Sequence, residues 1–258
     1  MFWLNNKQKK WCDFVIAMTE KEIKSRYKMA IFGFLWIFLN PLLQMLVMGL
    51  IFQFFVPIKN INYFEFLFPG LLLWNFFSYT LTKNTPMYIN ERALIQKAKF
   101  PRESVILSIV FSNLFHFCIS LLMFLLWTVL VRGSFDLGRW LMLPVAIVWL
   151  TVLTSALSLL FSSWNVKWRD INFGVQAIMP LWFYATPVVY TLDLLPKWIE
   201  KIIYLNPLTA ILGLFRWSIF GMPMAGAAII ISLLMTFFLL TIGIIVFKKE
   251  SPFFDDWI

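Results

Sequence analysis

Long stretches without a charged residue dominate this sequence. Residues 29–58 contain no Asp, Glu, Lys or Arg, and further apolar blocks follow along the chain. A helix needs about 20 apolar residues to cross a hydrocarbon core of ~30 Å. The chain of 258 residues is only 14% charged, whereas ordinary globular proteins carry roughly 25% charged residues. The sequence therefore predicts an all-α integral membrane protein.

Six transmembrane helices are expected from the apolar blocks. The predicted ranges are 34–56, 66–82, 104–131, 140–166, 171–192 and 224–247. None of these ranges contains an Asp, Glu, Lys or Arg, and Pro41 is expected to kink or break the first helix. His116 lies inside the third range, where a proton relay is one interpretation. Because no intramembrane carboxylate is available to exchange the proton, we favour a hydrogen bond from His116 to a neighbouring helix.

Basic residues are concentrated in alternate loops. Sixteen Lys and Arg residues fall in the segments 1–28, 83–103, 167–170 and 248–258. Six fall in the intervening segments 57–65, 132–139 and 193–223. The positive-inside rule places the first group in the cytoplasm, so both termini are expected there. The net charge of +9 is thereby explained by membrane topology, and nucleic acid is not an expected partner.

Residues 1–28 are predicted to form an amphipathic interface segment, separate from a transmembrane permease domain over residues 29–258. Trp11, Phe14, Val15 and Met18 have the spacing of one helix face. Such a helix can lie in the membrane interface, against membrane lipids. The alternative is a solvated helix that awaits a protein neighbour, and the two interpretations are compatible.

A short basic island over residues 90–102 lies between two long apolar runs. Leu94, Ile95 and Ala98 share one side of it, and Pro101 ends any helix there. A helix of about two turns is not stable alone in water. The island therefore needs a partner surface, which we interpret as a soluble motor protein.

Residues 193–223 form a second unusual stretch. The pieces 196–204 and 207–220 have helical composition, and Pro196 and Pro207 suit first-turn positions. Each piece is too short to cross a bilayer. We expect two short re-entrant helices on the outer side that line a cavity, with an ordinary surface hairpin as the alternative.

The sequence lacks the motifs of an energy-converting enzyme. It contains no G-x-x-x-x-G-K-[ST] phosphate loop and no cluster with metal-ligand or acid–base spacing. Its two cysteines, Cys12 and Cys118, indicate no disulfide or metal framework. No cofactor, metal site or catalytic residue is expected in this chain. A transporter of this composition would need energy from a separate subunit.

Three motifs, in order along the chain, resemble those of one family. Arg26-Tyr27-Lys28 leads into Gly33-Phe34-Leu35-Trp36 and Pro41-Leu42, the island contains Leu94-Ile95-x-Lys97-x-x-Phe100-Pro101-Arg102, and Asn206-Pro207 precedes the last apolar block. This arrangement resembles the type-2 ABC export permeases, the transmembrane subunits that export O-antigen, capsule or teichoic acid. Among them the chain most resembles the O-antigen exporter subunits.

The resemblance implies an assembly and several sites. Two copies of the chain would form a channel in the cell inner membrane, above two copies of an ATPase that binds ATP and Mg, and lipid-linked polysaccharide would be the substrate. The sequence has no G-x-x-x-G seam, so the homodimer follows from the resemblance alone. The ATPase-coupling helix would comprise Asn90, Glu91, Arg92, Leu94, Ile95, Lys97, Phe100 and Arg102. The loop through which substrate enters would comprise Arg26, Tyr27, Lys28 and Gly33. The outer gate would comprise Pro196, Trp198, Tyr204, Asn206 and Pro207.

Aromatic residues make up 19% of the chain. Most of them are expected to face lipid or to fill the interior of the helix bundle. A sliding polysaccharide nevertheless needs weak and frequent contacts, which aromatic faces stacked on sugar rings provide. The expected channel-lining aromatics are Phe34, Trp36, Trp182, Phe183 and Tyr184.

Other functions compete with polysaccharide export. A related permease for a drug or a lipid would have a similar basic island. A membrane-embedded transferase would need an essential acid or His116 facing the lipid headgroups. A passive scaffold would need no ATPase at all.

Overall fold

The computed structural model describes residues 6–27, 35–56, 62–97, 100–133 and 136–257. Most of these residues are helical, and no strand occurs among them. Two 3₁₀ turns are η2 (Leu192–Leu194) and η3 (Ser251–Phe253). The α-helices are α1 (Asn6–Tyr27), α2 (Trp36–Phe52), α3 (Tyr63–Asn84), α4 (Met87–Asn90), α5 (Arg92–Lys97), α6 (Glu103–Arg132), α7 (Leu137–Trp140), α8 (Leu143–Lys167), α9 (Asp170–Ala185), α10 (Lys197–Ile203), α11 (Pro207–Phe220), α12 (Gly226–Glu250) and α13 (Phe254–Trp257).

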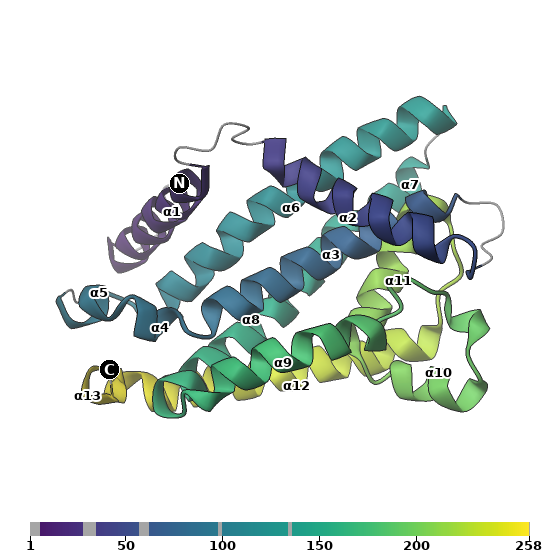
Figure 1. Cartoon of the computed structure of the whole chain (residues 1–258). Helices are drawn as coiled ribbons and strands as arrows, with labels where there is room; N and C mark the ends of the chain where they lie inside the picture. The colour runs from purple at the N-terminus through teal and green to yellow at the C-terminus, as the bar shows by residue number, and fades with distance from the viewer. Residues whose placement is uncertain (1–5, 28–34, 57–61, 98–99, 134–135, 258) are drawn as a thin grey trace.

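The long helices run side by side between two ends of the molecule (Figure 1). The short helices α4, α5 and α13 gather at one end, which we call the inner end after the topology predicted from the charges. The short helices α7 and α10 lie at the opposite, outer end. The two regions singled out in the sequence, the basic island and the proline-rich pair, therefore lie at opposite ends of the bundle.

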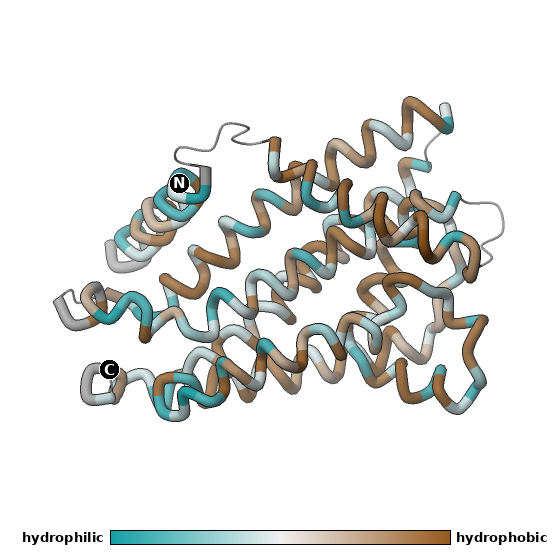
Figure 2. The backbone as a smooth tube through the Cα atoms, in the orientation of Figure 1, coloured by the Kyte–Doolittle hydropathy of each residue, from teal (hydrophilic) through white to brown (hydrophobic). Residues whose placement is uncertain are grey.

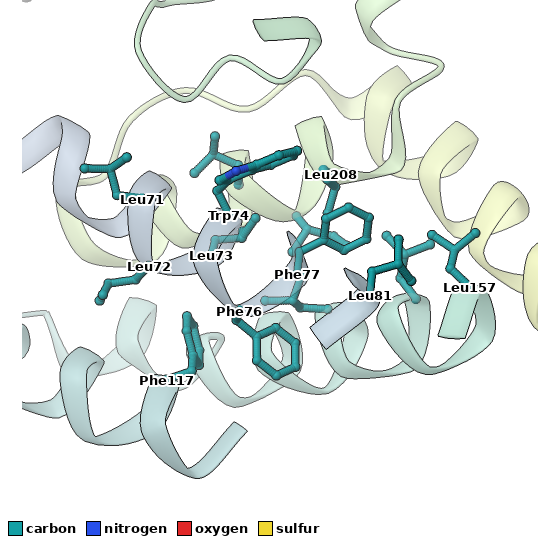
Figure 3. Close-up of a cluster of buried hydrophobic side chains, with 14 of the residues drawn as sticks. Leu71, Leu72, Leu73, Trp74, Phe76, Phe77, Leu81, Phe117, Leu157 and Leu208 are labelled. Atoms are coloured by element: carbon teal, nitrogen blue, oxygen red, sulfur yellow. The ribbon is translucent and has the colours of Figure 1, made fainter. Parts of the chain in front are cut away.

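Helix α3 is the centre of the packing. It contacts α2, α6, α8, α9 and α11. Leu73 and Phe77 are fully buried, and Figure 3 shows α3 side chains meeting Phe117 of α6, Leu157 of α8 and Leu208 of α11. A helix that is apolar on nearly every side belongs in the interior of a bundle.

Helices α6 and α12 are long and strongly apolar. Figure 2 shows many hydrophobic residues along α6, whereas hydrophilic residues gather on α1. Leu234, Phe237 and Ile245 of α12 are exposed, as suits a lipid-facing helix. The opposite side of α12 packs on α8, where a Cβ added to Gly243 would lie 2.5 Å from the Ala156 carbonyl oxygen. A small residue is therefore required inside this helix pair.

Three helical stretches are long and apolar enough to span a membrane: Glu103–Arg132, Leu137–Lys167 and Gly226–Phe253. The pair α10 and α11, bent by 97°, is a fourth candidate. The protein is thus a multi-pass α-helical membrane protein, as predicted. The predicted range 171–192 is too long, because helix α9 ends at Ala185. Thr186 is extended there, as expected for a residue before proline.

Candidate functional site

A cavity of about 900 Å³ lies between α2, α3, α6 and α9. Its lining carries a set of amide, hydroxyl and imidazole groups, from Asn40, Gln44, Asn75, Ser78, Tyr79, Thr82, Asn113, His116, Ser120 and Gln176. Asn75 Nδ2 donates to Gln44 Oε1 at 2.8 Å, which joins α3 to α2 within the lining. Polar groups are costly against hydrocarbon, so this wall suits water or a polar solute.

Aromatic rings form much of the remaining wall. Trp36, Phe183 and Tyr184, three of the aromatics predicted to line a channel, line this cavity. Trp182 is not among the lining residues: its Nε1 donates to Asn206 Oδ1 at 3.1 Å, and its ring packs edge-on against Phe77. Phe34 lies outside the described residues. Trp182 and Tyr184 thus have different surroundings although they belong to the same short helix segment.

Arg26 supplies a cation to the described lining of the cavity. Its Nη2 donates to Asn113 Oδ1 at 2.6 Å, and its Nη1 lies 3.2 Å from His116 Nδ1. Its guanidinium also lies 4.5 Å above the centre of the Tyr79 ring. His116 therefore contacts a neighbouring helix, as expected from the sequence. Helix α1 is in this way tied to both α6 and α3.

The packing of α1 explains how Arg26 reaches this position. Val15 is buried, Phe14 stacks on Phe100 at 5.0 Å, and Met18 packs against the core. Glu22 forms an ion pair with Lys83 of α3. The predicted apolar face of the N-terminal segment thus has a protein neighbour, chiefly α6. Of the predicted loop for substrate, Tyr27 ends α1, and Lys28 and Gly33 lie outside the described residues.

Asn206 ties the outer helix pair to the end of α9. Its Oδ1 accepts hydrogen bonds from Trp182 Nε1 and the Leu208 amide, both at 3.1 Å. Its Nδ2 donates to the Ala185 carbonyl at 3.1 Å and to Thr186 Oγ1 at 2.8 Å. One side chain thereby caps α11 and fixes it against the end of α9.

The remaining predicted gate residues surround this anchor. Pro207 occupies the first turn of α11, and Pro196 precedes α10 at its N-cap. Trp198 is exposed, and Tyr204 donates a hydrogen bond to Glu200. The five gate residues predicted from the sequence thus all belong to the bent pair of α10 and α11. Some of them, such as Asn206, hold the pair in place, whereas Trp198 lies at the surface.

Arg216 of α11 was not singled out as a site residue in the sequence. It is buried, and its guanidinium donates to the carbonyls of Pro187 and Val188, both at 2.7 Å. It also lies 3.5 Å from the centre of the Phe66 ring. The sequence did hold one signal for a special role of Arg216, because it is a single Arg within the apolar run of α11. The count of basic residues by segment, however, treated Arg216 as an ordinary loop residue.

The basic island forms an elbow of two short helices rather than one continuous helix. Asn90 ends α4, Glu91 lies at the break, and α5 covers Arg92–Lys97. Ile95 is buried, Arg92 is exposed, and Phe100 is stacked on α1. The side chains of Leu94 and Lys97 lie outside the described part of the chain, and Arg102 precedes α6 at its N-cap. We call residues 87–102 the elbow.

No group of three or more His, Cys, Asp or Glu residues capable of holding a metal occurs in the described ranges. The two cysteines, Cys12 and Cys118, are free thiols. The described lining of the cavity offers aromatic rings, amides, hydroxyls, the imidazole of His116 and the guanidinium of Arg26, groups that can bind a polar solute.

Comparison with known proteins places this geometry in a family context. Residues 14–220 match the ABC-2 type transporter family. The chain is 31% identical to the O-antigen export system permease protein RfbA of Klebsiella pneumoniae over 92% of each sequence. It is 32% identical to the Myxococcus xanthus protein of the same name over 78% of each sequence. It is 25% identical to the capsule polysaccharide export inner-membrane protein CtrC of Neisseria meningitidis, over 80% of this chain.

Proposed function

The chain belongs to the ABC-2 type transporter family and is a transport permease, and from this premise we propose that it exports lipid-linked, O-antigen-type polysaccharide across the cell inner membrane. The cavity between α2, α3, α6 and α9 is the observation that carries the proposal. Its lining combines aromatic rings with amides and hydroxyls, and no carboxylate occurs among the lining residues that the structure describes. Amides both donate and accept hydrogen bonds, as sugar hydroxyls require.

The assembly we propose is a homodimer above two copies of a separate ATPase, which binds ATP and Mg. In this arrangement α2, α3, α6, α8, α9 and α12 are the six spans, α10 and α11 form a re-entrant outer gate, and both termini are cytoplasmic. The 97° bend between α10 and α11 supports a re-entrant pair, because a straight span would have no such break. Two facing copies of the cavity would complete the polysaccharide path.

Substrate is proposed to enter near Arg26, Tyr27, Lys28 and Gly33. The Arg26 guanidinium lines the cavity and is held by Asn113. A cation in that position would attract an anionic headgroup on a lipid-linked substrate. The connection that follows α1 would then control access from the membrane.

Energy is proposed to enter at the elbow. Ile95 and Phe100 anchor it to the bundle, whereas Arg92 is exposed at its surface. An exposed cation on a short anchored helix suits a groove on a partner protein. Nucleotide binding by the ATPase would displace α5 and, through it, the helices that surround the cavity.

The test is transport by the purified permease reconstituted with its ATPase. Arg92→Glu and Lys97→Glu should abolish ATP-driven export, and Leu94→Pro should do the same by breaking α5. Lys249→Glu reverses a charge on an exposed residue of the inner end and is the control. Normal export by the elbow variants, or uphill transport without an ATPase, would contradict the proposal.

Lipid-linked capsular polysaccharide is the second candidate substrate, because the chain also resembles a protein named for capsule polysaccharide export. Both substrates would use the same cavity and elbow. Transport assays with purified lipid-linked O-antigen and capsular polymers, run side by side, decide between them.

A further inference from the structure

Three aromatic rings meet at the inner end, from parts of the chain that are far apart in the sequence. Phe254 of α13 packs against Tyr88 of α4 with ring centres 4.7 Å apart, and against Phe247 of α12 at 6.0 Å. Phe254 is 0% exposed and Tyr88 is 1% exposed. We call Tyr88, Phe247 and Phe254 the aromatic clasp.

Hydrogen bonding extends the clasp to the start of α6. Tyr88 Oη donates to the Arg102 carbonyl at 2.8 Å. Burial raises the pKa of Tyr88 well above its usual value, so this hydroxyl stays protonated and remains a donor. The Arg102 guanidinium lies 5.6 Å from the centre of the Phe254 ring. Helices α4, α6, α12 and α13 thus meet at one buried point.

The clasp also has a neighbour in α8. Helices α4 and α13 both contact α8, and the ammonium of Lys167, the last residue of α8, lies 5.5 Å from the centre of the Trp257 ring. At its other side the elbow is attached to α1 through the stack of Phe100 on Phe14. The elbow is therefore held between α1 and the C-terminal segment, residues 251–257.

We propose that Phe254 is a positioning residue for energy coupling, which fixes α4 to α8 and α12 so that a displacement of α5 moves the bundle. The inference rests on the proposed function of the elbow. Close-packed interiors transmit displacement because they leave no free volume to absorb it, and offset aromatic pairs also restrict the relative orientation of the elements that carry them. Without the Phe254 ring, α4 would gain free volume and could move alone.

The experiment measures polysaccharide transported per ATP hydrolysed in the reconstituted full transporter. Phe254→Ala should lower this ratio by about fivefold or more, the low end of typical coupling between sites. ATP hydrolysis and copurification of the ATPase should stay at the wild-type level. Phe254→Leu, which retains most of the volume, should restore much of the ratio. Phe253→Ala is the matched control, because Phe253 is adjacent but 50% exposed.

Each outcome decides a separate point. A wild-type ratio in Phe254→Ala, with uncoupling in Arg92→Glu, would overturn the role of Phe254 and leave the elbow proposal intact. Normal export in both variants would overturn the proposed function as well. Loss of ATPase copurification in Phe254→Leu would overturn positioning in favour of a docking role. Should Phe254→Ala fail to fold, the milder truncation Phe254→Val decides: a ratio below those of Phe254→Leu and Phe253→Ala supports the role, and a ratio equal to both refutes it.

Discussion

Nη2 of Arg216 donates a hydrogen bond of 2.7 Å to the backbone carbonyl of Val188, inside the protein. Nη1 makes an equally short bond to the Pro187 carbonyl. Helix α9 has already ended at Ala185, so these two carbonyls have left the helical hydrogen-bond pattern. Buried carbonyls need a partner, and the guanidinium provides it while linking α11 to the end of α9.

Replacement of Arg216 should destabilise the outer helix pair. Arg216→Ala leaves two buried carbonyls unpaired and should lower the free energy of unfolding by about 3 kcal/mol. Arg216→Lys should be intermediate, because a single ammonium does not match the two-pronged geometry of a guanidinium. Thermal unfolding in detergent measures the effect, with exposed Arg169→Ala as the control. Equal melting temperatures for all three variants would refute this role.

A methyl group at Gly243 should separate α12 from α8. The added Cβ would lie 2.5 Å from the Ala156 carbonyl oxygen, a backbone atom that cannot rotate away. Overpacking of this kind costs about 1–3 kcal/mol, so Gly243→Ala should lower the melting temperature. Gly226→Ala is the matched control, since a Cβ there meets nothing within 4 Å. The two variants behaving alike would show that the helix pair tolerates the methyl group.

Alanine substitutions at Trp182 and Tyr184 should have different effects, the first on stability and the second on transport. Trp182 donates a hydrogen bond to Asn206 and packs on Phe77. Trp182→Ala should therefore destabilise the protein by about 3 kcal/mol. Tyr184 is 57% exposed and lines the cavity, so Tyr184→Ala should reduce export while stability changes by less than about 0.5 kcal/mol. Melting temperature and export are measured for both. Normal export by Tyr184→Ala would remove Tyr184 from the proposed path.

The amide pair Gln44 and Asn75 should contribute to substrate binding. Loss of one hydrogen bond to a sugar hydroxyl costs about 0.5–1.5 kcal/mol. Gln44→Leu and Asn75→Leu should therefore each raise the apparent KM for the lipid-linked polymer by about 2–10-fold. The exposed Leu43→Met serves as the control on the same helix. An unchanged KM in both amide variants would show that the polymer does not contact this pair.

Local signals in the sequence predicted several parts of the candidate site. Pro207 predicted the first turn of α11, because the fixed φ of proline suits that position and its missing N–H is not needed there. Asn206 was selected only through the family resemblance, and the structure shows that its side chain caps α11. Trp36, Phe183 and Tyr184 were selected as aromatics without nearby charge, and they line one cavity. The same criterion selected Trp182, which is bonded to Asn206. Composition does not distinguish the two sides of a helix whose neighbours are unknown.

The sequence by itself determined that this protein is helical and embedded in a membrane, because charge-free runs of such length bury their backbone polar groups in lipid only as helices. Its motifs also determined the family. Only the tertiary structure decided that Arg216 lies inside the bundle, that Arg26 reaches Asn113, and that Phe254 packs against Tyr88. Hydropathy is a property of neighbouring residues, whereas these contacts join residues distant in the chain and exist only once the helices have packed.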